Sequence, residues 1–359
     1  MTRAARPRRS TERNGRIPST LSWALGAAAL ALLAAPIAEG GPPDAEGTPM
    51  VVDLHVDLPW QIHFKKRGDG LIEGHVRTET LRAGGYGGIV LPIYLPDYLH
   101  ADGAHVEDAE AVYETIQRVV AKNAIFLPLL STRAQPNRVA TWLAIEGAGG
   151  FAGDPKQIDR FIARGVRLVG PVHAKNGQLA SSATGKAVSH GLTAAGKVLA
   201  ERVYGQGALI DVSHLSDKAF DDVAAIAEQH GAPVVATHSN ARAIAPNPRN
   251  LTDAQLRVIG KSGGVAGLNF HAPFVAKGDD VGIAEVIKQV EHMVAVAGID
   301  HVAIGSDFDG GIRPAKGLED AAGLAALARA LERRGMKRDD VLKIFSLNAL
   351  RVLAWRPSR

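Results

Sequence analysis

The sequence predicts an α/β fold, a (β/α)8 barrel of the TIM type behind an N-terminal leader. The first observation is an alternation of short apolar runs with longer amphipathic segments, which is typical of parallel strands joined by helices. The second is that there are eight such runs, the number that closes a barrel. They cover residues 51–55, 88–95, 141–146, 166–172, 208–213, 233–237, 264–270 and 301–306. The third is the length of 359 residues, which suits an elaborated barrel.

The segments between the runs carry helix signals. Val112, Ile116 and Val119 fall on one face at helical spacing. Ser216 is expected to cap a helix that stops before Gly231, and Thr252 begins a capping-box pattern. The second run contains a proline, at position 92, which removes one ladder donor from that strand.

Residues 1–38 are predicted to be a signal peptide or an N-terminal membrane anchor. Residues 1–16 hold six arginines and one glutamate, and residues 17–38 are free of charge, which is the pattern of an export leader. We therefore expect an exported protein, in the bacterial periplasm or on the extracytoplasmic face of the membrane. A glycine- and proline-containing spacer at 39–49 would precede the barrel domain at 50–355.

The composition excludes some classes of function and some kinds of site. The basic leader accounts for the formal charge of +4, so the body is nearly neutral and nucleic-acid binding is not expected. The absence of cysteine excludes disulfides and thiolate ligands.

Histidines and carboxylates gather at the ends of the apolar runs. Because the carboxyl ends of barrel strands meet on one face, such side chains are expected to converge there. Seven of the eight runs end in this way, with His55 and Asp57, Glu146, His173, His214, His238, His271 and Asp307. His55 and Asp57 stand two residues apart and would project from the same face of a strand.

Each of these residues alone could serve a structural role, but together they predict a metal site. Imidazole and carboxylate ligands suit zinc and would also accept manganese, cobalt or iron.

Six motifs in order along the chain resemble those of the membrane (renal) dipeptidase family of zinc metallopeptidases. The resemblance extends from about residue 50 to the segment 350–353. The motifs are Asp-Leu-His-Val-Asp-Leu-Pro-Trp (53–60), Ile-Glu-Gly (145–147), Leu-Ile-Asp-Val-Ser-His-Leu-Ser (209–216), His-Ser-Asn-Ala-Arg-Ala (238–243), Pro-Arg-Asn (248–250) and Gly-Ser-Asp-Phe-Asp-Gly (305–310).

The resemblance implies a barrel of the metal-dependent hydrolase kind that cleaves dipeptides with two Zn²⁺ ions. By motif position, His55 and Asp57 would bind one ion, and His214 and His238 the other, with Glu146 bridging the two. A hydroxide between the ions would then attack the peptide carbonyl.

The resemblance also implies roles for three further residues. His173 would contact the substrate and stabilise the oxyanion, Arg249 would hold the substrate carboxylate, and Asp307 would move the proton. Family members often form homodimers, so a homodimer is expected as well. A membrane tether is expected from the uncharged stretch of the leader, if that stretch is retained as an anchor.

Three departures from the family pattern bear on substrate choice. The segment 174–182 replaces the usual Trp-Ala-Asp-Ser, His271 stands where an aromatic residue is common, and Ser346 replaces a glycine. Two alternatives to a dipeptidase stay open. One is another amide or lactone metallohydrolase, acting on N-acyl amino acids or β-lactam-like compounds. The other is a non-catalytic tethered binding protein.

Overall fold

The computed structural model describes residues 1–2, 47–101, 103–131, 137–186 and 190–357. The leader predicted at 1–38, apart from its first two residues, and most of the spacer at 39–49 lie outside the described residues. Within the described ranges, no helix has the length and apolar character needed to cross a membrane.

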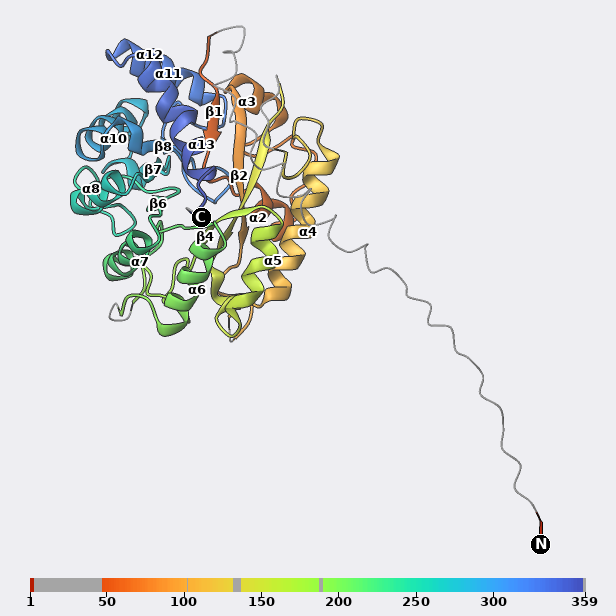
Figure 1. Cartoon of the computed structure of the whole chain (residues 1–359). Coiled ribbons are helices and arrows are strands. Elements are labelled where there is room, and N and C mark those ends of the chain that lie inside the picture. Colours follow the sequence, from red (N-terminus) through yellow and green to blue (C-terminus); the bar gives the residue numbers. More distant parts are fainter. Residues whose placement is uncertain (3–46, 102, 132–136, 187–189, 358–359) are drawn as a thin grey trace. The chain divides into compact units, whose positions relative to one another are not determined.

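Eight parallel strands form the centre of the domain, as the eight apolar runs predict (Figure 1). The sheet order β5-β4-β3-β2-β1-β8-β7-β6 places the strands beside their sequence neighbours, except β5 and β6 at its two ends, and joins the first strand to the last. This arrangement confirms the (β/α)8 barrel. The strands are β1 (Val51–Asp53), β2 (Tyr86–Tyr94), β3 (Ala140–Glu146), β4 (Val166–Gly170), β5 (Leu209–Ile210), β6 (Val235–Ala236), β7 (Val265–Leu268) and β8 (Val302–Ile304).

The gap between β5 and β6 is closed by one isolated bridge, Asp211 with Val235, and by a hydrogen bond from the Val212 amide to the Val235 carbonyl at 2.9 Å. Both strands are shorter than their apolar runs. The cause is the Asp211 carboxylate, whose Oδ1 accepts the amides of Ser213 at 3.0 Å and Thr237 at 2.9 Å. Because these amides bind a side chain, they leave the ladder and both strands end early. In contrast, β2 runs through Pro92, which lies opposite Ala144 of β3.

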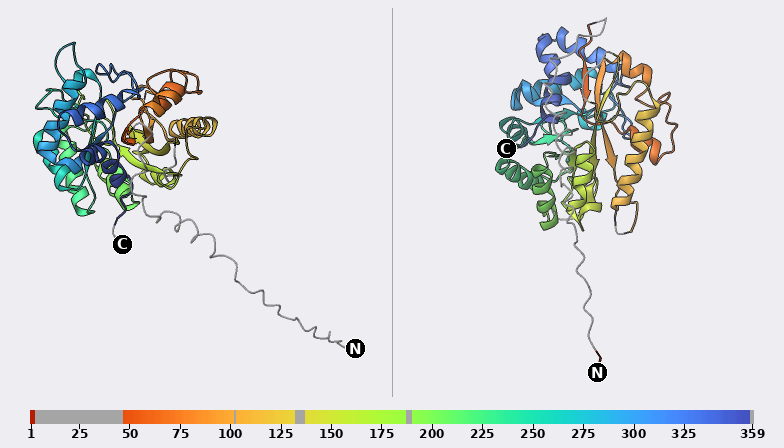
Figure 2. Two further views of the ribbon diagram at one scale, coloured as in Figure 1. Left: turned by 90° about the horizontal axis from the view of Figure 1, so that it is seen from above. Right: turned by 45° about the vertical axis from the view of Figure 1, so that its right-hand side comes forward.

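Helices cover the outside of the strands, as the two further views also show (Figure 2). Their starts follow the sequence signals: Ser216 Oγ accepts the Ala219 amide at 3.2 Å, and Thr252 and Gln255 form the predicted capping box. The α-helices are α2 (Leu58–His63), α3 (Thr78–Ala83), α4 (Val106–Lys122), α5 (Ile158–Ala163), α6 (Ala194–Gly205), α7 (Asp217–Gln229), α8 (Asp253–Lys261), α9 (Ala272–Val275), α10 (Ile283–Ala297), α11 (Gly323–Arg333), α12 (Arg338–Leu342) and α13 (Asn348–Leu353). Short 3₁₀ turns are η1 (Ala148–Phe151), η2 (Pro155–Gln157) and η3 (Ile299–His301).

The C-terminal helices hold β8 in place. A π-helical turn, η4 (Lys343–Leu347), precedes α13, and the buried Asn348 begins that helix. The Asn348 side-chain amide donates to the carbonyls of Ile299 at 2.9 Å and Val302 at 2.8 Å. Ser346, at the position of the family glycine, donates to the Leu342 carbonyl at 3.1 Å. The asparagine therefore anchors the strand that leads to Asp307.

Candidate metal centre

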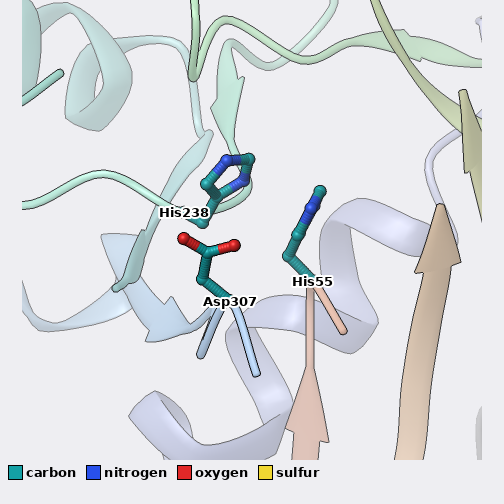
Figure 3. A group of neighbouring side chains, drawn as sticks. All are labelled: His55, His238 and Asp307. Atoms are coloured by element: carbon teal, nitrogen blue, oxygen red, sulfur yellow. The ribbon is translucent and has the colours of Figure 1, made fainter. Parts of the chain in front are cut away.

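The predicted ligands converge at the carboxyl end of the barrel. His55 lies two residues after the end of β1, Glu146 is the last residue of β3, and His238 and Asp307 follow β6 and β8. Figure 3 shows the side chains of His55, His238 and Asp307 turned toward one another. One potential ligand atom from each lies within 4.8 Å of the other two. Residues separated by more than 180 positions in the chain thus share one small space.

Glu146 lies between two groups of ligands. Its Oε2 atom is 3.6 Å from His55 Nε2, which in turn is 3.4 Å from an oxygen of Asp57. Its Oε1 atom is 2.9 Å from His214 Nε2 and 3.9 Å from His238 Nε2. One carboxylate oxygen therefore faces each group, which is the arrangement expected of a bridging ligand.

A hydrogen-bonded chain fixes the tautomer of His238. The Thr237 hydroxyl donates to Asp211 Oδ2, so its oxygen is left to accept from His238 Nδ1, 2.6 Å away. With the imidazole proton held on Nδ1, the lone pair of Nε2 points toward His214 and Glu146. The sequence alone assigned no role to Thr237. Its position directly before His238 is the signal that could have identified it as a partner of that imidazole.

A second buried carboxylate, Asp53, joins the ends of β1 and β8. It is fully buried, and its Oδ1 accepts the amides of His55 at 3.1 Å and Ser306 at 2.9 Å, while Oδ2 accepts the Tyr86 hydroxyl at 3.1 Å. These bonds hold His55 and the residue before Asp307 at a fixed separation.

The charges at the centre suit a cation. Burial and the positive charge of Arg249 lower the pKa of His214 well below its usual range, and burial together with His55 does the same for His238. Both imidazoles are therefore neutral, the form that binds metal. Burial opposes the charged form of His55, but Asp57 and Glu146 outweigh it and raise the pKa of His55 well above its usual value. The carboxylates thus already attract positive charge to this point.

Two further observations fit a metal rather than a packed polar core. The buried His55 Nε2 has no hydrogen-bond partner among the described residues. Gly310 borders the same space, and a Cβ atom there would lie 2.5 Å from Asp307 Oδ1 and 2.6 Å from Asp57 Oδ2. Glycine therefore keeps room open beside two carboxylates.

Asp307 is held in an unusual backbone conformation, with a φ of 63°. Its Oδ2 accepts from the Asn269 side-chain amide at 2.9 Å, so one oxygen is fixed and the other remains near Asp57. Loss of water around the carboxyl and the negative charge of Asp57 raise the pKa of Asp307 to about 8. This group can therefore bind and release a proton near neutral pH.

His173 and Arg249 both border the centre next to His214. His173 Nδ1 is 3.2 Å from the Tyr94 hydroxyl, whose pKa burial and Glu146 raise, so the hydroxyl keeps its proton and can donate. His173 Nε2 then carries a proton, 3.9 Å from Glu146 Oε1. Arg249 is buried with Nη2 3.3 Å from His214 Nε2, and no described carboxylate lies within 4.0 Å of its guanidinium.

All of the predicted site residues except His55 line one cavity of about 360 Å³. Besides the predicted residues, its walls contain aromatic and small side chains that sequence reasoning did not assign: Trp60, Tyr94, Thr184, Phe274, Gly310 and Gly311. His271 also lines it but belongs to none of the ligand groups found among the described residues. Asp97, likewise unassigned, accepts the amides of Ala174 at 3.0 Å and Lys175 at 3.2 Å and so fixes the segment after His173.

A (β/α)8 barrel with clustered histidines and carboxylates at its carboxyl rim defines the class of metal-dependent hydrolases. Residues 47–355 match the family model described as membrane dipeptidase, peptidase family M19. The chain belongs to the membrane dipeptidase family, as its motifs indicate. The match covers the whole barrel, so the chain is a metal-dependent dipeptidase.

Curated relatives and solved structures agree with this assignment. An uncharacterised protein encoded 5′ of pqqA in Klebsiella pneumoniae is 41% identical over 62% of this chain and 84% of that protein. Dipeptidase ataJ of Aspergillus terreus is 28% identical over 84% of this chain and 83% of its own length. A metallopeptidase of Rhodobacter sphaeroides, solved with a phosphinate mimic of L-Ala-D-Ala, superposes with a TM-score of 0.76 at 27% identity, covering 85% of this chain and 99% of that one.

Proposed function

We propose that the chain hydrolyses dipeptides with two zinc ions, one held by His55 and Asp57, the other by His214 and His238, with Glu146 shared between them. The observation that carries this proposal is the position of Glu146, whose two oxygens face the two groups at 3.6 Å and 2.9 Å. Bound zinc would supply a water molecule of lowered pKa and would polarise the peptide carbonyl.

The proton transfer is assigned to Asp307. Its carboxyl borders Asp57, and Asn269 holds one of its oxygens, so the other oxygen is available to accept a proton from the attacking water. The same group would then deliver that proton to the leaving amine. His173, with a proton on Nε2, would donate to the oxygen on which negative charge develops.

Arg249 supports a substrate with a free carboxylate. A buried guanidinium without a carboxylate partner is costly, and Nη1 of Arg249 has no hydrogen-bond partner among the described residues. A substrate carboxylate would satisfy it by a charge-assisted pair. A cavity of about 360 Å³ accommodates a dipeptide beside this group.

A panel of dipeptides tests the proposal. The purified chain is stripped with a chelator and assayed on L-L, L-D and glycine-containing dipeptides with and without added zinc. Turnover that depends on zinc supports the proposal. Hydrolysis of N-acyl amino acids in preference to every free dipeptide would replace it with the amide hydrolase alternative, and zinc binding without any turnover would favour the binding-protein alternative.

We also propose export through the predicted leader at 1–38, supported by its arginines followed by an uncharged stretch. Fractionation of cells expressing the full chain tests this: the barrel is expected in the periplasm or at the outer surface of the membrane. A membrane tether and a homodimer stay predictions, to be checked by membrane extraction and by sedimentation of the purified chain.

A further inference from the structure

His271 lies in the wall of the cavity and takes no part in the proposed metal centre. It is the residue before α9, and its ring packs edge-on against Phe274 with 4.8 Å between ring centroids. The Arg249 guanidinium lies 5.8 Å from the centroid of the same phenylalanine ring. His271 therefore borders the part of the cavity next to the proposed carboxylate-binding arginine.

The imidazole is held as a hydrogen-bond donor. The Arg313 amide donates to His271 Nδ1 at 3.0 Å, so the neutral ring carries its proton on Nε2. Among the described residues, none hydrogen-bonds Nε2. Burial lowers the pKa of His271, which keeps the ring in this neutral form at pH 7.

The backbone around the ring is fixed on both sides. The His271 amide donates to Asn269 Oδ1 at 2.7 Å, and the Ala272 amide donates to the Arg313 carbonyl at 2.8 Å. Asn269 also holds Asp307, so the position of His271 is tied to that of the proton-transfer group. A donor fixed in this way loses little freedom when it binds a ligand.

Arg313 adds a positive charge near the His271 ring, from an exposed side chain that is not among the residues lining the cavity. Its guanidinium acts on the His271 ring electrostatically, and within the described part of the chain no carboxylate lies within 4.0 Å of it. A fixed N–H donor in the cavity wall, within the positive field of an arginine, favours a carboxylate as its partner.

We propose that His271, with the positive charge of Arg313 acting on it from outside the cavity, forms a side-chain subsite that selects dipeptides with an acidic C-terminal residue, aspartate or glutamate. The inference rests on the proposed function, because Arg249 would hold the α-carboxylate of that residue. The side-chain carboxylate of aspartate or glutamate is separated from the α-carboxylate by a short carbon chain, so it would reach the neighbouring part of the wall, where His271 lies.

The test compares kcat/KM for Ala-Glu and Ala-Ala with the zinc-loaded chain. The wild type is expected to prefer Ala-Glu. His271→Phe keeps an aromatic ring against Phe274 but removes the donor, and should lower the Ala-Glu to Ala-Ala ratio about tenfold, mainly through the KM for Ala-Glu. His271→Gln retains an N–H donor and should recover part of the ratio, and Arg313→Ala should lower it.

His292→Phe is the matched control, because this histidine lies on α10, pairs with Asp253 at 2.8 Å and is not among the cavity residues. It should leave the ratio unchanged. Two results would contradict the subsite but leave the proposed dipeptidase function intact. The first is a wild type that cleaves Ala-Ala and shows no preference for Ala-Glu. The second is a His271→Phe variant in which kcat/KM changes equally for both substrates. If the wild type cleaves neither dipeptide, nor any other in the panel, the proposed function fails and the subsite with it.

Discussion

Replacing Gly310 with alanine should disable the site with little effect on the rest of the fold. The added Cβ would lie 2.5 Å from Asp307 Oδ1 and 2.6 Å from Asp57 Oδ2, whereas ordinary contact begins at 3.4 Å. Both carboxylates must therefore retreat by nearly an ångström or the loop must shift. Gly310 is not one of the glycines with a positive φ, so alanine is not strained by its φ, although the added Cβ would also lie 3.0 Å from the Asp307 carbonyl oxygen.

The size of the effect follows from that displacement. A misplacement of about 1 Å in a catalytic group costs on the order of 100-fold in rate. We therefore expect kcat/KM for dipeptides to fall about 100-fold, equivalent to about 2.7 kcal/mol, with reduced zinc occupancy at the site that includes Asp57. The measurements are dipeptide kinetics, metal content by mass spectrometry and a thermal melt of the same preparation.

Gly205→Ala is the matched control. Gly205 is the exposed last residue of α6, and a Cβ there would meet nothing within 4 Å. This variant should keep wild-type activity and gain up to about 1 kcal/mol of stability from helix propensity. Wild-type kcat/KM in Gly310→Ala would refute the reasoning, because it would mean that the two carboxylates are not needed where the structure places them.

Three other substitutions separate the remaining roles. Asp307→Asn should reduce turnover by at least about 100-fold while zinc content stays near that of the wild type, and full activity would remove the proton-transfer role. Thr237→Val removes the acceptor of the His238 Nδ1 proton, so zinc affinity measured by competition with a chelator should fall about 10- to 100-fold; an unchanged affinity would contradict the tautomer argument. Arg249→Met should lower kcat/KM for a dipeptide at least about tenfold but should have little effect on the corresponding dipeptide amide, and equal losses on both would show that Arg249 does not bind the carboxylate.

Much of the fold could be predicted because the apolar runs are short, regular and eight in number. The strand ends could not be predicted. The runs at 208–213 and 233–237 are apolar enough to continue as strands. However, the Asp211 carboxylate accepts hydrogen bonds from the amides of Ser213 and Thr237, and both strands end there. This competition depends on two segments lying side by side, so it cannot be seen in either segment alone.

The ligand set could be proposed from the sequence because barrel topology brings strand ends together. The residues that orient these ligands could not be proposed from the sequence, because their roles depend on contacts between distant strands. Tyr94 orients His173 across 79 positions, and Asn269 fixes Asp307 across 38. Gly310 is the last residue of a recognisable motif, but its importance for the site is seen only when Asp57 is placed beside it.

Counting the metal ions bound per chain, in the wild type and in Glu146→Gln, tests the central claim most directly. Glu146 offers one oxygen to each ligand group, so the wild type should bind two divalent ions and the variant should lose occupancy at both positions. A wild type that binds a single ion at saturation, or a variant that loses only one of two, would contradict a shared carboxylate.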